Sequence, residues 1–113
     1  MRYLLILVFA FPLAAQQPRT VTPGFVAVNA ASFGAAALDV ALTQRCIRAG
    51  TCHESNPLMK GSAGRMYGIA LGMSAAGTLV DYELEKRGHK EGRVIPWVVL
   101  GAHGFGAGMA LRF

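Results

Sequence analysis

The chain has 113 residues, a length that fits one domain. Only 15% of its residues are charged and 53% are apolar, whereas soluble domains usually carry roughly 25% charged residues. Its net charge is +5, but the basic residues lie in short runs beside apolar segments, without the interleaved aromatic residues of a nucleic-acid surface. The composition therefore favours a membrane protein whose basic residues face lipid headgroups, and it argues against a nucleic-acid partner.

The first 15 residues have the pattern of an export signal. A short positive region is followed by apolar residues 3–11 and then by small residues that suit cleavage after Ala15. The apolar part is short for a bilayer core, which needs roughly 20 apolar residues. We therefore predict a signal peptide at 1–15, with an uncleaved anchor as the alternative, and a single helical domain at 16–113.

Three apolar stretches follow, separated by two polar connections. We expect helices near 25–45, 63–84 and 94–112, because these stretches are poor in charged residues and long enough for helices. Each stretch is short or weak as a lone transmembrane span. The prediction is therefore an all-α fold, a small transmembrane bundle of three Gly/Ala-rich helices that pack on one another.

Small residues recur at every fourth position of these stretches. This spacing lets the backbones of membrane helices approach closely. In a soluble protein, each glycine inside a helix would cost about 1 kcal/mol relative to alanine. We therefore predict helix packing through Gly64, Gly68 and Gly72 on the second helix and through Gly104 and Gly108 on the third.

The last residues also allow another architecture. Large and small residues alternate from 104 to 113, as in the closing strand of an outer-membrane β-barrel. However, eight strands of about 10 residues would consume roughly 80 residues. Alanine-rich stretches such as 32–42 are also poor strands. A β-barrel fragment is therefore the remote alternative to the helical bundle.

Cys46 and Cys52 lie in the first polar connection. Their spacing could close a small disulfide loop in an oxidising compartment. An export signal that leaves residue 16 outside would instead put this connection in the cytoplasm. The distribution of Lys and Arg does not decide the orientation, because each side of the membrane would carry five of these residues. A metal site of Cys46, Cys52, His53 and Glu54 matches no zinc pattern, so we predict no metal and no cofactor.

Asp39 is the polar residue that bears most on function. A carboxylate inside an apolar helix is costly in a membrane and is by default a functional-site hypothesis. It shares one polar or small face with Asn29, Ser32 and Thr43, and this face should point into the bundle. His103 is its expected partner, either in a proton- or cation-binding pair or in a buried hydrogen bond that fixes the helix register.

The segment 54–58 (Glu-Ser-Asn-Pro-Leu) precedes the second helix, and its Asn-Pro is typical of a turn. Together with the earlier Asp39-x3-Thr43, it is similar to a group of short bacterial membrane proteins of unknown function, which share an Asp-x3-Thr helix end followed by Glu-x-Asn-Pro-Leu. The resemblance implies a multi-pass protein of the bacterial inner (cytoplasmic) membrane and brings no known activity. It also implies a cluster at one membrane face, made of Asp39, Thr43, Glu54 and Asn56.

The sequence contains no pattern of a catalytic triad, a phosphate-binding loop or a dinucleotide site. Asp81 is expected to be a solvated helix end. We therefore predict a non-enzymatic structural or interaction protein whose partners are the lipid bilayer and either a second copy or a larger membrane protein. The alternative function is an oligomeric ion- or proton-binding transport unit that uses Asp39 with His103 or Glu54. The candidate polar site comprises Asp39, Thr43, Glu54, Asn56 and His103.

Overall fold

The computed structural model describes residues 20–112, which form three α-helices and one short 3₁₀-helix and contain no strand. The elements are α2 (Pro23–Arg48), α3 (Ala63–Lys86), η1 (Lys90–Arg93) and α4 (Val94–Ala110). The prediction of an all-α fold with three helices is confirmed. The alternating residues after 104 do not form a strand, because α4 continues through them to Ala110. The predicted signal peptide lies outside the described residues.

Hydroxyl side chains cap the first two helices. Thr22 Oγ1 accepts a hydrogen bond from the Phe25 amide at 3.1 Å, and Pro23 occupies the first helical position, where no amide hydrogen is needed. Ser62 Oγ accepts from the Arg65 amide at 3.2 Å at the start of α3. The Thr22 cap explains why the first helix begins slightly before the apolar stretch from which it was predicted.

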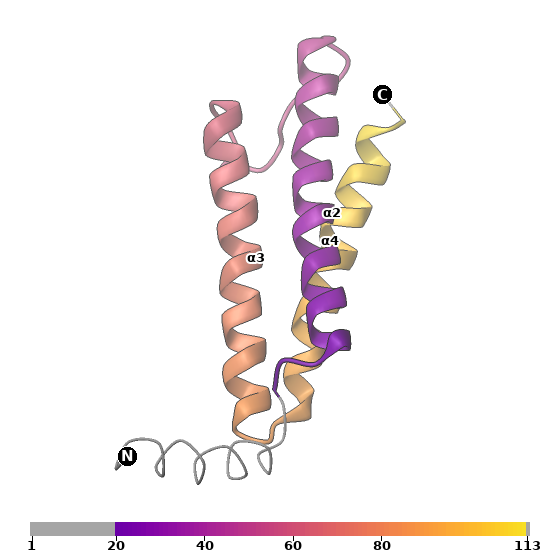
Figure 1. Ribbon diagram of the computed structural model, residues 1–113. Helices are drawn as coiled ribbons and strands as arrows, with labels where there is room; N and C mark the ends of the chain where they lie inside the picture. The colour runs from indigo at the N-terminus through magenta and orange to yellow at the C-terminus, as the bar shows by residue number, and fades with distance from the viewer. Residues whose placement is uncertain (1–19, 113) are drawn as a thin grey trace, which may run out of the picture.

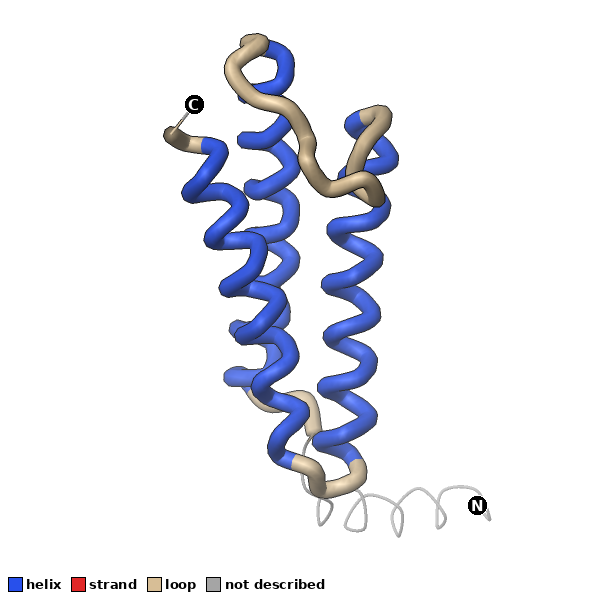
Figure 2. The backbone as a smooth tube through the Cα atoms, turned by 180° about the vertical axis from the view of Figure 1, so that it is seen from behind, coloured by secondary structure: helices blue, strands red, loops and turns tan. Residues whose placement is uncertain are grey.

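In the view of Figure 1, α4 crosses behind α2 and α3 runs alongside them, and α2 packs against both of the other helices. The contact of α4 with α2 is more extensive than its contact with α3. Figure 2 shows α3 and α4 meeting at the η1 turn and diverging toward the opposite end, where the loop 49–62 leads from α2 to α3. Side chains of both helices and of this loop line a cleft at that end.

Two glycines shape the turn between α3 and α4. Gly88 has a φ of 85°, a left-handed conformation that commonly follows the end of a helix. Gly92 is buried, and a Cβ added there would lie 2.9 Å from Leu84 Cβ and 3.2 Å from Asp81 Oδ1. The turn can therefore fold back closely over the end of α3 because residue 92 has no side chain.

The core between the helices is narrow and made of small or flexible side chains. Its apolar part consists of Ala36, Val40, Met66 and Ala70. Ser32 and Ser74 are equally buried, each 1% exposed. Met66, Ala70 and Ser74 lie four residues apart, so one face of α3 supplies the packing toward the core.

The predicted glycine stripes lie on the outer surface. All five glycines are exposed, and an added Cβ would meet nothing within 4 Å at four of them and only Ser62 at Gly64. Positions two apart on an α-helix point in nearly opposite directions, and the buried positions of α3 are offset from the stripe by two residues. The stripes therefore do not pack helices within this chain, contrary to the expectation for Gly64, Gly68, Gly72, Gly104 and Gly108.

Among the described helices, α2 is long and apolar enough to cross a membrane by length and composition. Only 22% of its most apolar window is buried inside the protein. A core helix of a soluble protein would be mostly buried, and α2 is not.

Candidate functional site

Asp39 on α2 and His103 on α4 are in direct contact. The distance from His103 Nδ1 to Asp39 Oδ2 is 2.8 Å. The side chain of His103 is 13% exposed and that of Asp39 is 19% exposed, so the pair is largely shielded from the surroundings of the protein. An imidazole nitrogen that carries a proton donates to a carboxylate in either charge state of the ring. The two residues that the sequence suggested as partners are therefore neighbours in the fold.

Gly106 allows this contact to form. A Cβ at position 106 would lie 2.6 Å from Asp39 Oδ1 and 2.9 Å from Asp39 Cγ. His103 and Gly106 are three residues apart and share one face of α4, so the imidazole and the bare backbone meet the same carboxylate. Gly106 could not be singled out from the sequence, because its Gly-x-Gly spacing gives no indication of which glycine faces a carboxylate.

The pair forms part of the wall of a cleft of about 650 Å³. Residues of α3 and α4 line its sides, α2 contributes Asp39, Val40 and Thr43, and the loop contributes 52–56 and Met59. The fold thus gathers polar groups from α2, the loop and α4 around one space. All five residues of the candidate polar site line it: Asp39, Thr43, Glu54, Asn56 and His103.

Local hydrogen bonds shape the part of the loop that lines the cleft. The Asn56 amide donates to Glu54 Oε1 at 2.8 Å, and the Leu58 amide donates to Asn56 Oδ1 at 3.0 Å. The second bond spans Pro57 and is the turn typical of an Asn-Pro sequence. Within the described residues, no hydrogen bond joins Glu54 or Asn56 to Asp39.

A disulfide between Cys46 and Cys52 ties the start of the loop to the end of α2. Cys46 is 3% exposed, and Thr51 Oγ1 lies 3.3 Å from its carbonyl oxygen. Because the two sulfurs are bonded to each other, neither is a free thiolate ligand. The part of the chain that the structure describes holds no group of three His, Cys, Asp or Glu residues arranged for a metal ion.

No family model, curated protein or solved structure matches the chain.

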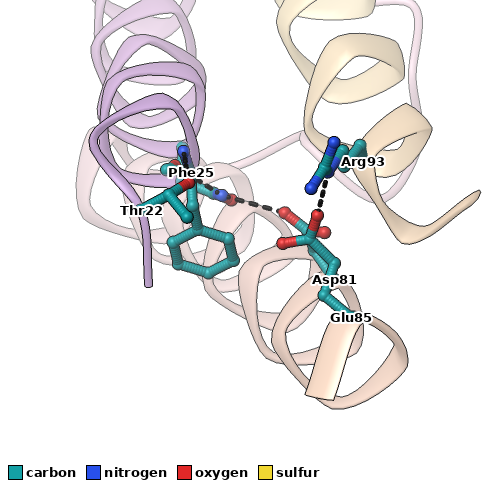
Figure 3. Close-up of polar contacts among 6 residues, drawn as sticks. Thr22, Phe25, Asp81, Glu85 and Arg93 are labelled. Atoms are coloured by element: carbon teal, nitrogen blue, oxygen red, sulfur yellow. Dashed lines mark hydrogen bonds and ion pairs between the residues drawn. The ribbon is translucent and has the colours of Figure 1, made fainter. Parts of the chain in front are cut away.

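A second polar cluster lies at the other end of the bundle, near η1. Asp81 is 1% exposed, and Asn29 Nδ2 donates to its Oδ2 at 3.0 Å. Thr78 Oγ1 donates to Asn29 Oδ1 at 2.7 Å. Figure 3 shows Asp81 beside Glu85 and Arg93, which form an ion pair between α3 and the turn. The cluster joins α2, α3 and the turn through polar contacts.

The expectation that Asp81 is a solvated helix end is wrong. The turn at Gly92 covers it, and Asn29 approaches it from α2. Asp81 Oδ1 has no hydrogen-bond partner within the described residues. At the η1 end of the bundle, the polar face predicted on α2 therefore faces the carboxylate of Asp81. Burial of this carboxylate is costly in free energy unless Asn29 remains hydrogen-bonded to it.

Proposed function

We propose that this chain is a small integral membrane protein whose three helices cross a bilayer, and that its role is structural or interactive and not enzymatic. The observation that carries the proposal is that polar side chains are buried while large apolar side chains are exposed. Beside the apolar core, the buried positions include Asn29, Ser32, Ser74 and Asp81. Large apolar side chains lie on the outside of all three helices, among them Leu38, Leu79, Val98 and Phe105.

This distribution suits lipid better than water. Exposed apolar side chains over a whole helical surface are unfavourable in water, and in a bilayer they contact acyl chains. Exposure of polar groups to lipid is unfavourable in free energy, so membrane helices bury their polar side chains between helices and pair them by hydrogen bonds. The Asn29–Asp81 and Asp39–His103 contacts are two such hydrogen bonds inside the bundle.

The helix lengths are compatible with a bilayer core of about 30 Å. The 26 residues of α2 and the 24 residues of α3 extend over about 39 Å and 36 Å. The 17 residues of α4 extend over about 26 Å and include no Asp, Glu, Lys or Arg. Crossing by α3 and α4 depends on their packing with α2, since α2 is the one described helix that is both long and apolar enough to cross a membrane.

The outer glycine stripes suggest how the protein meets its partners. Gly68 and Gly72 on α3, and Gly104 and Gly108 on α4, leave open space where another helix backbone could approach closely. We propose that these faces contact a second copy or a larger membrane protein in the inner membrane of a bacterium.

Membrane insertion can be tested directly by fractionation. The full chain should remain in the membrane pellet after alkaline carbonate extraction and enter solution with detergent. A Gly68→Leu variant should insert equally well and lose cross-linked oligomers, whereas Ala31→Leu, an exposed position outside the α3 and α4 stripes, should keep them. Recovery of the chain in the carbonate supernatant would exclude the proposal.

The contact between Asp39 and His103 favours a second function, binding of a proton or a cation within a transport unit. A carboxylate paired with an imidazole inside a membrane protein is a common proton-relay arrangement. Three helices enclose too little volume for a path, so this function requires oligomers. In reconstituted vesicles, Asp39→Asn should abolish proton or sodium uptake, while Glu83→Gln at an exposed carboxylate should not. Absence of uptake by the unmodified chain would reject this function.

A further inference from the structure

The cleft between α3 and α4 combines a polar end with an apolar length. Asp39, Glu54 and Thr43 belong to the polar end. The apolar part includes four of the five methionines of the chain. Methionine side chains are flexible and polarizable, so they adapt to ligands of irregular shape. Such a lining suits an amphipathic molecule with a mobile apolar tail.

The charges at the polar end favour a cationic headgroup. Asp39 and Glu54 are carboxylates, and no Lys or Arg is among the residues that line the cleft. Asp39 Oδ2 binds His103, while Asp39 Oδ1 has no hydrogen-bond partner within the described part of the chain. A primary ammonium group donates three hydrogen bonds and carries the opposite charge. Thr43 and Ser55 add hydroxyl donors for a neighbouring phosphate.

The cleft is open along its side. Met73, Val98 and Phe105 line it and are 60%, 62% and 73% exposed. In a bilayer these side chains would face acyl chains. A molecule can therefore enter laterally from the lipid, without passing through the loop that lies over the polar end.

The volume of the cleft suits a small ligand. Ligand pockets commonly measure about 300–1,000 Å³, and the cleft measures about 650 Å³. The two carboxylates at the polar end, and not the volume, favour a cationic lipid headgroup over an apolar helix of a second copy.

We infer that the cleft binds one phospholipid whose headgroup carries a primary ammonium group. The ammonium lies between Asp39 and Glu54, and one acyl chain lies along Met73, Val98 and Phe105. The inference rests on the proposed membrane location, because lateral entry needs lipid around α3 and α4. The inference gives the loop and the Asp39–His103 pair a role in binding a lipid headgroup. Membrane insertion alone does not require such a role.

The test uses the full chain in detergent, with lipids counted by native mass spectrometry. Phosphatidylethanolamine and phosphatidylglycerol with identical acyl chains serve as probes. One phosphatidylethanolamine should remain bound per chain, about tenfold more tightly than phosphatidylglycerol. Asp39→Asn combined with Glu54→Gln should abolish this preference.

Variants that fill the cleft distinguish lipid bound in the cleft from lipid bound elsewhere on the protein surface. Ala102→Trp and Met73→Trp should each lose bound lipid, while Ala31→Trp, an exposed position outside the cleft, should retain it. Equal binding of the two lipids, or retention of lipid by both cleft-filling variants, would overturn the inference. Carbonate extraction of the same variants is measured separately, so failure to insert and failure to bind lipid are distinguished.

Discussion

The backbone of Gly106 passes so close to the carboxylate of Asp39 that a Cβ at residue 106 would lie 2.6 Å from Oδ1. The same carboxylate is held on its other oxygen by His103. The side chain of Asp39 is short and already paired, so it cannot move aside without losing the imidazole. The three residues therefore form one unit that sets the distance between α2 and α4.

Replacing Gly106 by alanine tests this unit. We expect Gly106→Ala to lower the free energy of unfolding by about 1–3 kcal/mol, because overpacking forces the helices or the carboxylate to shift. Gly108→Ala is the matched control, because an added Cβ there meets nothing within 4 Å. It should be neutral or stabilising by up to about 1 kcal/mol, since alanine favours helix. Unfolding in mixed detergent micelles measures both. Equal effects at the two positions would contradict the proposed close approach.

The Asp39–His103 contact should show energetic coupling. We expect Asp39→Asn and His103→Ala each to destabilise the bundle, and the double variant to lose less than the sum of the two. A coupling of about 0.5–3 kcal/mol is typical for residues in direct contact. The same measurement on Asp39 with Glu54 serves as the comparison, because no hydrogen bond joins that pair. Additive effects for Asp39 and His103 would show that the contact contributes nothing to stability.

Much of the fold follows from local signals in the sequence. The apolar stretches and their polar separators predict three helices, and the Asp39–His103 contact was suggested because these are isolated polar residues in two apolar helices. The polar spacing from Asn29 to Ser32 predicted the inward face of α2, which both residues occupy. These features depend on periodicity within one segment, and periodicity is visible in a single sequence.

The packing of α3 could not be predicted in the same way. Its two opposite faces, one with Gly68 and Gly72 and the other with Ala70 and Ser74, both carry small residues at a spacing of four. Size and spacing therefore do not indicate which face turns inward. Burial of Asp81 was missed for a related reason: it depends on how the turn at Gly92 folds back, a contact between segments.

Asn29 should be more important for stability than its exposed polar neighbours. Asn29→Ala removes the donor to Asp81 and the acceptor of the Thr78 hydroxyl. We expect a loss of about 1–3 kcal/mol, because a buried carboxylate is left without its partner. Asp81→Asn should cost less, since it removes the buried charge and keeps a polar group beside Asn29. Glu83→Ala, which breaks an exposed ion pair with Arg87, should change stability by at most about 1 kcal/mol. A larger loss for Glu83→Ala than for Asn29→Ala would contradict this ranking.

The disulfide leads to a prediction about orientation. If Cys46 and Cys52 are bonded in the cell, the loop 49–62 faces an oxidising compartment. If α2 and α3 each cross the membrane once, as proposed, the turn at η1 and the start of α2 then face the cytoplasm. Both cysteines should resist maleimide labelling under denaturing conditions until a reductant is added. A reporter fused after Cys52 should be active outside the cytoplasm, and one fused after Gly88 should be active inside.

This orientation conflicts with cleavage of a signal peptide after Ala15, because cleavage would leave residue 16 and the start of α2 outside. We therefore expect the intact mass of the mature protein to include residues 1–15. Cys46→Ser with Cys52→Ser is the control for labelling, and it should leave both reporter activities unchanged, since the helices and not the disulfide set the topology. A mature chain that begins after residue 15 and carries two free thiols would reverse the orientation and place the polar end of the cleft on the cytoplasmic side.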